Sequence, residues 1–350
     1  MNYYDNSVVF NDLKEIAKSN VNFQKFRNAT VLITGINGML ATYLAYSLFY
    51  LNDHENLGVR VIGLGRNKKE FTKKLPNLET LNFEFVEQDV TDRINIEEKI
   101  DYIFHAATNA SPESMVKQPV EISLTNTLGT YNVAELAKKN DAHLHFFSTR
   151  EVYGSNPNIQ LKENDDSIVN ILNVRDVYPI AKLSAESMLL AYHEEYGLDI
   201  SISRIAHAYG PTMKIDGRVM SDFIGKVKEN QDIILNSNGS AERAFIYVTD
   251  AISAIFYIVL NHTEKNFVMN ISNELEPITV KQLALLISRC SERFSKSIEV
   301  QHDLKKSSAL GYSKNIRKPL DTSRLEKTGW SPKVLLADGI MRTLKVLLPL

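Results

Sequence analysis

Short apolar runs alternate with longer stretches of helical periodicity between residues 30 and 206, and this alternation constrains the fold of the chain most strongly. Strands are predicted at 30–34, 59–64, 83–86, 102–105, 143–148 and 200–206. Helices are predicted between them at 38–51, 120–140 and 178–196. Strand, helix and strand in this order form βαβ units, which build a parallel sheet. The sequence therefore predicts an α/β protein.

After residue 206 the alternation becomes less regular, which indicates a second, smaller lobe. The length of 350 residues also favours roughly two domains. We expect a cofactor domain over 29–206, to which 243–262 returns, and a C-terminal substrate-binding lobe formed mainly by 207–242 and 263–350. Residues 1–28 are expected to form an N-terminal extension with a short amphipathic helix, which docks on its own domain or on a neighbouring subunit.

Charge and cysteine content exclude several classes of protein. Forty Lys and Arg against 42 Asp and Glu give a net charge of −2, whereas nucleic-acid binding usually needs a basic stripe. The single Cys290 cannot form an intrachain disulfide. The N-terminus is unlike a signal peptide, and the longest uncharged apolar stretch, 38–51, is too short to span a bilayer. We expect a cytoplasmic protein with no nucleic-acid or membrane partner and no metal.

The first predicted strand leads directly into the run Thr34-Gly35-Ile36-Asn37-Gly38-Met39-Leu40-Ala41, and a helix follows. Small residues at such a turn allow the backbone to approach a pyrophosphate, which then lies at the helix N-terminus. A glycine pair alone is a weak signal, but its place between the first strand and a helix makes it specific. The sequence therefore predicts a Rossmann-type, doubly wound sheet in which Gly35, Asn37, Gly38 and Met39 bind a dinucleotide.

The end of the second predicted strand leaves the choice between NAD and NADP open. Proteins that bind NAD usually have an acidic residue there, whereas this chain has Arg66. Arg66 could bind the 2′-phosphate of NADP, stack beside the adenine, or lie in solvent as a loop arginine. Asp89, after the third strand, is placed to bind the adenine amino group.

Tyr178 and Lys182 lie one helical turn apart and therefore share a helix face. Beside a nicotinamide, a lysine cation lowers the pKa of a phenol, so that the tyrosine can act as acid or base near neutral pH. A Tyr-x-x-x-Lys pair is frequent by chance. Three further elements at compatible distances strengthen it here, namely the glycine turn, Ser148-Thr149 at a strand end, and Asn126.

Residues 29–345 resemble the extended short-chain dehydrogenase/reductase family, the NAD-dependent sugar-nucleotide epimerases and dehydratases. The matching segments occur in the family's order at 105–107 (HAA), 126–130 (NTLGT), 148–154 (STREVYG), 209–211 (YGP), 243–250 (RAFIYVTD) and 329–332 (GWSP). The resemblance implies a nucleotide-diphosphate sugar as substrate and a nicotinamide cofactor that stays bound. It also implies a homodimer, because members of the family usually pair through a four-helix interface.

The resemblance assigns roles to the shared residues. Tyr178 would take the proton of the sugar C4 hydroxyl while a hydride leaves C4, and Thr149 would hydrogen-bond the same oxygen. Lys182 would also hold the nicotinamide ribose. The cofactor site would include further residues, namely Val90, Ala106, Ala107 and Asn126.

The residues after the fifth strand bear on the reaction that follows C4 oxidation. Glu151 stands where dehydratases and decarboxylases of the family carry a functional glutamate, which disfavours simple C4 epimerisation. The position before it is Asp in the dehydratases and Ser in the UDP-glucuronate decarboxylases, but here it is Arg150, which cannot usefully donate a proton. Arg150 could pair with a substrate carboxylate or turn outward as a loop residue.

Other segments resemble the decarboxylase branch, including the loop with Ser111 and the run 210–224. By the resemblance Arg243 binds the diphosphate and Arg218 lines the nucleotide or diphosphate pocket, although either could be a surface ion pair. His207 replaces a frequent Asn and either donates one hydrogen bond to the substrate or lies in the core. We expect a UDP-glucuronate decarboxylase-like enzyme; the alternatives are a 4,6-dehydratase, an epimerase, or a non-catalytic nucleotide-sugar-binding relative.

Overall fold

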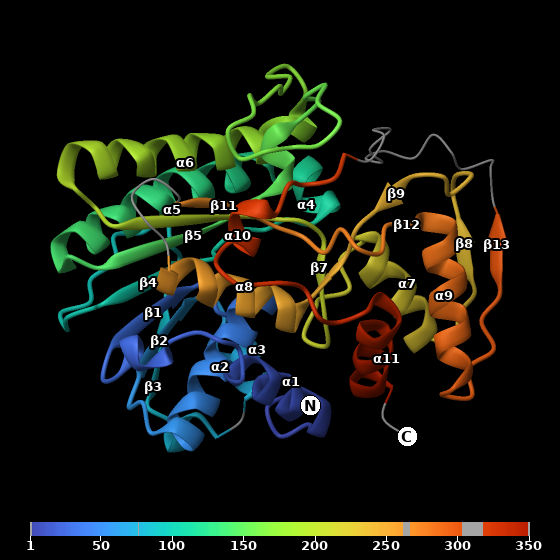
Figure 1. Ribbon diagram of the computed structural model, residues 1–350, viewed down its shortest axis with the longest axis horizontal. Coiled ribbons are helices and arrows are strands. Elements are labelled where there is room, and N and C mark those ends of the chain that lie inside the picture. The colour runs from blue at the N-terminus through green and yellow to red at the C-terminus, as the bar shows by residue number, and fades with distance from the viewer. Residues whose placement is uncertain (1, 76, 262–266, 303–317, 349–350) are drawn as a thin grey trace.

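A computed structural model describes residues 2–75, 77–261, 267–302 and 318–348 of the chain. Its centre is a seven-stranded sheet in the order β11-β6-β5-β4-β1-β2-β3, and every neighbouring pair is parallel (Figure 1). The strands are β1 (Thr30–Thr34), β2 (Arg60–Gly65), β3 (Phe83–Glu87), β4 (Tyr102–His105), β5 (His143–Thr149), β6 (Ile200–Ile205) and β11 (Val268–Ile271). The predicted doubly wound α/β fold is confirmed.

Helices cover both faces of this sheet (Figure 1). One face carries α1 (Ser7–Ala17), α2 (Met39–Glu55), α3 (Lys68–Lys74) and α8 (Val248–Asn261), and the other carries α5 (Pro119–Asn140) and α6 (Val177–Tyr196). Side chains alternate along each strand, so Val31 and Ile33 enter the core under α2 and α8, whereas Leu32 enters the core under α5 and α6. The strand order reverses between β1 and β4, and a ligand crevice is expected outside the strand ends at such a point.

A smaller group of elements lies beside the carboxyl ends of the strands (Figure 1). In the described part of the chain it contains the helices α7 (Val219–Lys228), α9 (Val280–Glu292) and α11 (Leu336–Leu347) and three strand pairs, whereas the short α10 (Ser323–Glu326) packs against β11 and α8. The pairs are β7 (Ala208–Tyr209) with β10 (Ile246–Tyr247), β8 (Ile233–Leu235) with β13 (Val300–His302), and β9 (Glu242–Arg243) with β12 (Ile278–Thr279). Helix α9 begins with a capping box between Thr279 and Gln282.

The chain passes between the two parts more than once. Helix α8, which lies within the expected returning segment 243–262, packs on the sheet face. Strand β11 lies beyond that segment, and it also joins the sheet by pairing with β6. The division into a cofactor domain and a substrate lobe stays a prediction. Residue 262 of the returning segment, and 263–266, 303–317 and 349–350 of the expected lobe, lie outside the described residues.

The N-terminal extension packs on its own chain. Helix α1 contacts α2, α8 and α11, and its buried Asp12 accepts hydrogen bonds from Tyr43 (3.0 Å), Tyr247 (2.7 Å) and Arg342 (2.9 Å). These three partners come from α2, β10 and α11, so Asp12 connects the N-terminal extension to three distant parts of the chain. Among the described residues, none of the helices combines the length and apolar character needed to cross a membrane.

Candidate active site

The glycine turn brings the ends of β1 and β4 into direct backbone contact. Gly35 has φ +67°, and a Cβ atom on it would lie 2.7 Å from the Cα and N of Ala107 and 2.8 Å from the carbonyl oxygen of Ala106. Gly38 is the N-cap of α2 and has no side chain to satisfy the first helical N–H groups. Met39 is the first residue of α2. A helix N-terminus open in this way is suited to the pyrophosphate of a dinucleotide.

Asn126 gives a second, independent sign of a ligand near this turn. Its side chain is fully buried on α5, and its Nδ2 donates to Ile122 O (2.8 Å) and Thr108 Oγ1 (3.1 Å). Its Oδ1 is buried without a hydrogen-bond partner among the described residues. Buried acceptors are nearly always paired, so this oxygen fits a donor supplied by a bound group, such as a hydroxyl of the cofactor. The residues present therefore fit NAD.

Arg66 and Asp89 lie together at the adenosine end of the predicted site. Arg66 is more than half exposed and contacts Glu121 Oε1 at 2.6 Å and Asp89 Oδ2 at 3.4 Å. Burial raises the pKa of Asp89, but two hydrogen bonds from Thr91 and the charge of Arg66 outweigh it and lower that pKa. Arg66 is thus a surface arginine held by two carboxylates. The side chain of Val90 is buried, and Asn37 Nδ2 donates to Asn67 O at 3.0 Å.

Strand β5 and helix α6 bring the predicted catalytic residues together. Tyr178 and Lys182 are both buried, and the hydroxyl of Thr149, the last residue of β5, hydrogen-bonds the Tyr178 phenol. The Lys182 ammonium donates to Phe147 O (2.6 Å) and lies 4.3 Å from the centroid of the Phe146 ring. The Tyr178 phenol and the Thr149 hydroxyl therefore meet at the end of β5, and the Lys182 ammonium binds the backbone of the same strand two residues earlier.

The electrostatics of this group differ in part from the sequence expectation. Burial raises the pKa of Tyr178 above its usual value, and the charge of Glu151 adds to this. The Thr149 hydrogen bond and the charges of Arg218 and Arg175 lower that pKa but do not outweigh burial. The lowering cations are thus these two arginines, whereas the sequence had pointed to Lys182. Burial lowers the pKa of Lys182 itself to about 7.

Glu151 lies in the 3₁₀ turn Arg150–Tyr153 that follows β5, and its carboxylate is held by Arg175. The two Glu151 oxygens lie 3.0 and 3.3 Å from the Nη atoms of Arg175, a bidentate ion pair. Arg175 comes from the 3₁₀ turn Val174–Asp176 just before α6. Sequence reasoning missed it; its place three residues before Tyr178 was the available signal.

Two further arginines share this site. Arg243 in β9 is partly buried; burial and the positive charge of Arg150 lower its pKa, and Glu151 raises it. Arg150 contacts Lys318 O at 3.5 Å, and Arg243 donates to Glu242 O at 2.8 Å. The charge of Arg150 thus acts on Arg243, and the role of Arg150 toward a substrate stays a prediction. Two guanidinium groups brought together in this way favour an anion between them.

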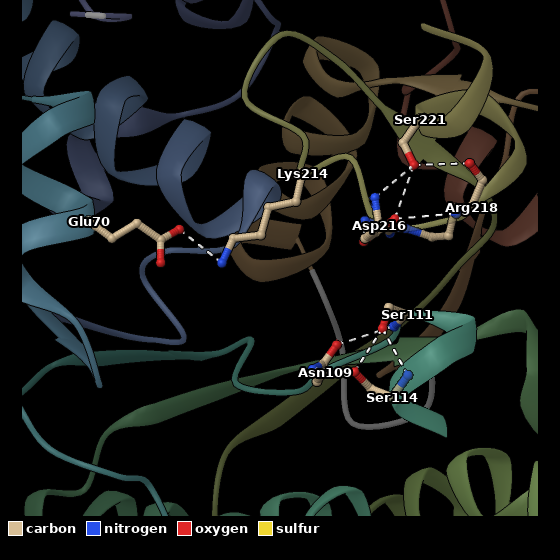
Figure 2. A network of polar contacts seen from close by, with 8 residues as sticks. All are labelled: Glu70, Asn109, Ser111, Ser114, Lys214, Asp216, Arg218 and Ser221. Carbon is tan, nitrogen blue, oxygen red and sulfur yellow. Dashed lines mark hydrogen bonds and ion pairs between the residues drawn. The ribbon is translucent and has the colours of Figure 1, made fainter. Parts of the chain in front are cut away.

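The loops with Ser111 and Arg218 carry separate polar networks (Figure 2). Ser111 caps α4 (Pro112–Lys117) by accepting from Ser114 N at 3.1 Å. Arg218 precedes α7 and forms an ion pair with Asp216 at 2.7 Å, which agrees with the alternative that it is a surface ion pair. Its positive charge nevertheless lowers the pKa of Tyr178. Figure 2 also shows the ion pair of Lys214 with Glu70 of α3 (2.9 Å), which joins this loop to the cofactor-binding part.

His207 has φ +43°, unusual for a residue with a side chain, and its ring centroid lies 5.7 Å from that of Phe245. Its substrate role stays a prediction. Over the part of the chain that the structure describes, no group of three or more His, Cys, Asp or Glu residues could hold a metal ion.

Comparisons with known proteins agree with this geometry. Residues 31–272 match the NAD dependent epimerase/dehydratase family. The chain is 33% identical to UDP-glucuronic acid decarboxylase 3 of Arabidopsis thaliana over 89% of this chain and 87% of that protein. It is 31% identical to UDP-glucuronic acid decarboxylase 1 of Xenopus tropicalis, over 90% and 71%.

Among solved structures, the UDP-glucose 4-epimerase of Thermotoga maritima is similar, with a TM-score of 0.76 and 26% identity. The similarity covers 91% of this chain and 98% of that one. The predicted family and the class of cofactor are thereby confirmed. The chain belongs to the NAD dependent epimerase/dehydratase family, and it is an NAD-dependent enzyme that modifies nucleotide sugars.

Proposed function

We propose that the protein decarboxylates UDP-glucuronate by transient oxidation at the sugar C4. The observation that carries this proposal is the gathering of arginines about Tyr178 and Glu151. The positive charge of Arg150 lowers the pKa of Arg243 by repulsion. The charges of Arg175 and Arg218 lower the pKa of Tyr178. UDP-glucuronate carries a diphosphate and a carboxylate, and guanidinium groups pair with both in bidentate fashion.

The chain's own residues would perform the proton transfers. Tyr178, oriented by Thr149, takes the C4 hydroxyl proton and later returns it to the same oxygen. When bound, NAD accepts a hydride from C4, gives it back at the end, and adds a positive charge beside the phenol. Lys182 would hold the nicotinamide ribose, and the backbone at Gly35 and Gly38 would hold the pyrophosphate.

Decarboxylation needs little beyond this shared set. A ketone at C4 makes the C6 carboxylate a β-keto acid, so the C5–C6 bond breaks and its electron pair moves into the carbonyl as an enolate. Carbon dioxide leaves, and C5 takes up a proton. No residue has to remove a proton from C5. Both oxygens of Glu151 are engaged by Arg175, which supports an orienting role for this carboxylate.

A 4,6-dehydratase is the second candidate, because Glu151 lies near enough to Tyr178 to raise its pKa and could remove a C5 proton. That reaction also needs an acid to protonate the departing C6 hydroxyl. Arg150 stands at the position for this acid and keeps its proton. Thr149, Tyr178 and Lys182 are all present and together, which argues against a non-catalytic relative.

The first test is the conversion of UDP-, dTDP-, GDP- and CDP-sugars by the purified protein, followed by mass spectrometry. We expect loss of carbon dioxide from UDP-glucuronate. Loss of water from a neutral hexose would favour the dehydratase, and an unchanged mass with altered stereochemistry would favour an epimerase. Either of these results, without turnover of UDP-glucuronate, contradicts the proposal.

Arg150→Met is expected to raise the KM for UDP-glucuronate about 10- to 100-fold, because a charge-assisted pair contributes about 1.5–3 kcal/mol. Steady-state kinetics measure this KM. Inhibition by UDP-glucose, which has the same diphosphate and no carboxylate, is the matched control and is expected to change little. If the binding of UDP-glucuronate and the binding of UDP-glucose were weakened equally, Arg150 would be assigned to the diphosphate instead.

We further propose a homodimer formed through α5 and α6, by analogy with the family. An apolar row on one face of α5 supports it, since Val120 is 70% exposed and Leu124, Leu128 and Tyr131 are more than 40% exposed. Their spacing of three and four residues places them on one helix face. Leu190 of α6 is exposed as well.

The double variant Leu124→Arg and Leu128→Arg is expected to be monomeric, because it places two cations in the proposed interface. Light scattering after size exclusion measures the mass, which should be half that of the wild type. Leu275→Arg is the control, since Leu275 is an exposed leucine in the loop after β11. A wild-type chain that is already monomeric at micromolar concentration would refute the interface.

A further inference from the structure

Three successive residues at the end of β5 hold three side chains of α6. Phe147 accepts from the Lys182 ammonium through its carbonyl oxygen, Ser148 donates a short hydrogen bond to Glu186, and Thr149 bonds the Tyr178 phenol. The α6 residues recur every fourth position, at 178, 182 and 186, so they share one face of the helix. Glu186 is therefore the next member of the row that contains the catalytic pair.

Glu186 is a buried carboxylate that the reaction does not use directly. It is 7% exposed, and Arg204 of β6, 8% exposed, holds it through contacts of 3.2, 3.2 and 2.7 Å. Arg204 also donates to Glu163 O at 3.0 Å, and its guanidinium lies 4.9 Å from the centroid of the Tyr153 ring. A buried ion pair of this kind often adds little net stability, because removing both charges from water costs about as much as their attraction returns.

The charge of Glu186 acts on Lys182. Burial lowers the pKa of Lys182 to about 7, and Glu186 is the carboxylate that opposes this change within the described part of the chain. The other titratable group on which Lys182 acts is His105 on β4, and Arg204 on β6 binds the far side of Glu186. Burial and Lys182 lower the pKa of His105 to about 3, so that ring stays neutral near pH 7.

We propose that Glu186, fixed between Ser148 and Arg204, is a positioning residue that keeps the Lys182 ammonium charged where it binds Phe147 O, near the end of β5. This inference rests on the role of Lys182 in the proposed function. A neutral lysine has lost the positive charge with which Lys182 would hold the nicotinamide ribose in the proposed function. The pair Glu186–Arg204 would thus set the upper pH limit of activity.

Glu186→Gln tests this proposal, because glutamine keeps the shape and acceptor of the side chain but loses its charge. Without the anion, Lys182 gives up its proton more easily. The alkaline limb of kcat/KM should therefore move down by about one pH unit, as for the loss of one nearby buried charge. Activity should fall several-fold at pH 8 and little at pH 6.

Glu163→Gln is the matched control. Glu163 is buried to the same degree, contacts Arg324 at 3.4 Å, and accepts from Asn270 N at 3.0 Å, but it does not act on Lys182. Both variants are expected to lower Tm, and only Glu186→Gln is expected to shift the alkaline limb. A purely structural role for Glu186 predicts a lower Tm in both variants with an unmoved limb, and that result overturns the proposal.

A readout independent of turnover separates this inference from the proposed function. In protein labelled with ¹³Cε-lysine, the Lys182 signal, assigned by its loss in Lys182→Arg, reports the protonation of that side chain. We expect its titration midpoint to be lower in Glu186→Gln than in the wild type, and equal midpoints would refute the proposal.

A second variant, Ser148→Ala, serves if Glu186→Gln fails to fold, because it frees Glu186 from β5. It should shift the titration midpoint of Lys182 in the same direction by less, and an unshifted midpoint would also refute the proposal. A wild type that converts no UDP-glucuronate would contradict only the proposed function.

Discussion

Tyr178→Phe is expected to lower kcat by about 10²- to 10⁴-fold, the usual contribution of a positioned acid or base. The substitution removes one hydroxyl from a side chain that is 5% exposed and leaves the ring, so packing should be retained. The lost hydroxyl is the one that Thr149 bonds and that lies within reach of the charges of Glu151, Arg175 and Arg218. Proton transfer at the C4 oxygen therefore loses its donor and acceptor.

Single-turnover and steady-state kinetics, together with the NAD content of the purified protein, check this expectation. Tyr46→Phe is the matched control, because Tyr46 is another buried tyrosine, its hydroxyl donates to Lys74 O at 3.0 Å, and it belongs to a different core cluster from Tyr178. That control should cost about 1 kcal/mol of stability and leave kcat unchanged. Full turnover by Tyr178→Phe would remove Tyr178 from the proton-transfer role.

Most of the sheet could be predicted from the sequence because strands such as β1, β5 and β6 are buried on both faces, whereas β11 was not predicted. Such strands appear as continuous apolar runs, and β1 and β4 begin and end at the residues expected from their runs. The glycine turn and the Tyr178–Lys182 pair could be predicted for a related reason. Each lies within a few residues of chain, so its geometry follows from one turn or one helix.

The contacts that complete the site are of a different kind. Arg175 and Glu151 are separated by 24 residues and lie on two irregular turns, and neither turn has a periodic pattern from which the contact could be read. Arg66 could not be assigned for the same reason, because its partner Glu121 is 55 residues away, on α5. Two-residue strands such as β9 and β12 are too short to show alternation at all.

Gly35→Ala is expected to lower both the stability and the NAD content of the protein, because two independent costs meet at this position. An alanine at φ +67° costs about 1–2 kcal/mol from the left-handed backbone alone. Its Cβ would also lie 2.7 Å from backbone atoms of Ala107, which follow the buried strand β4 and cannot rotate away. The turn must then open, which moves the N-terminus of α2 from the position that suits a pyrophosphate.

Gly197→Ala separates the two costs. Gly197 follows α6 with φ +68°, and a Cβ atom there would meet no atom within 4 Å, so this variant carries the backbone cost without the clash. We expect Gly197→Ala to lose about 1–2 kcal/mol and keep its NAD. Gly35→Ala should lose more stability and retain less than about a tenth of the bound NAD, since 1.4 kcal/mol of affinity is already tenfold. Thermal unfolding and cofactor extraction measure both quantities. Equal destabilisation of the two variants with NAD content unchanged in Gly35→Ala would show that the close contact with Ala107 does not shape the cofactor site.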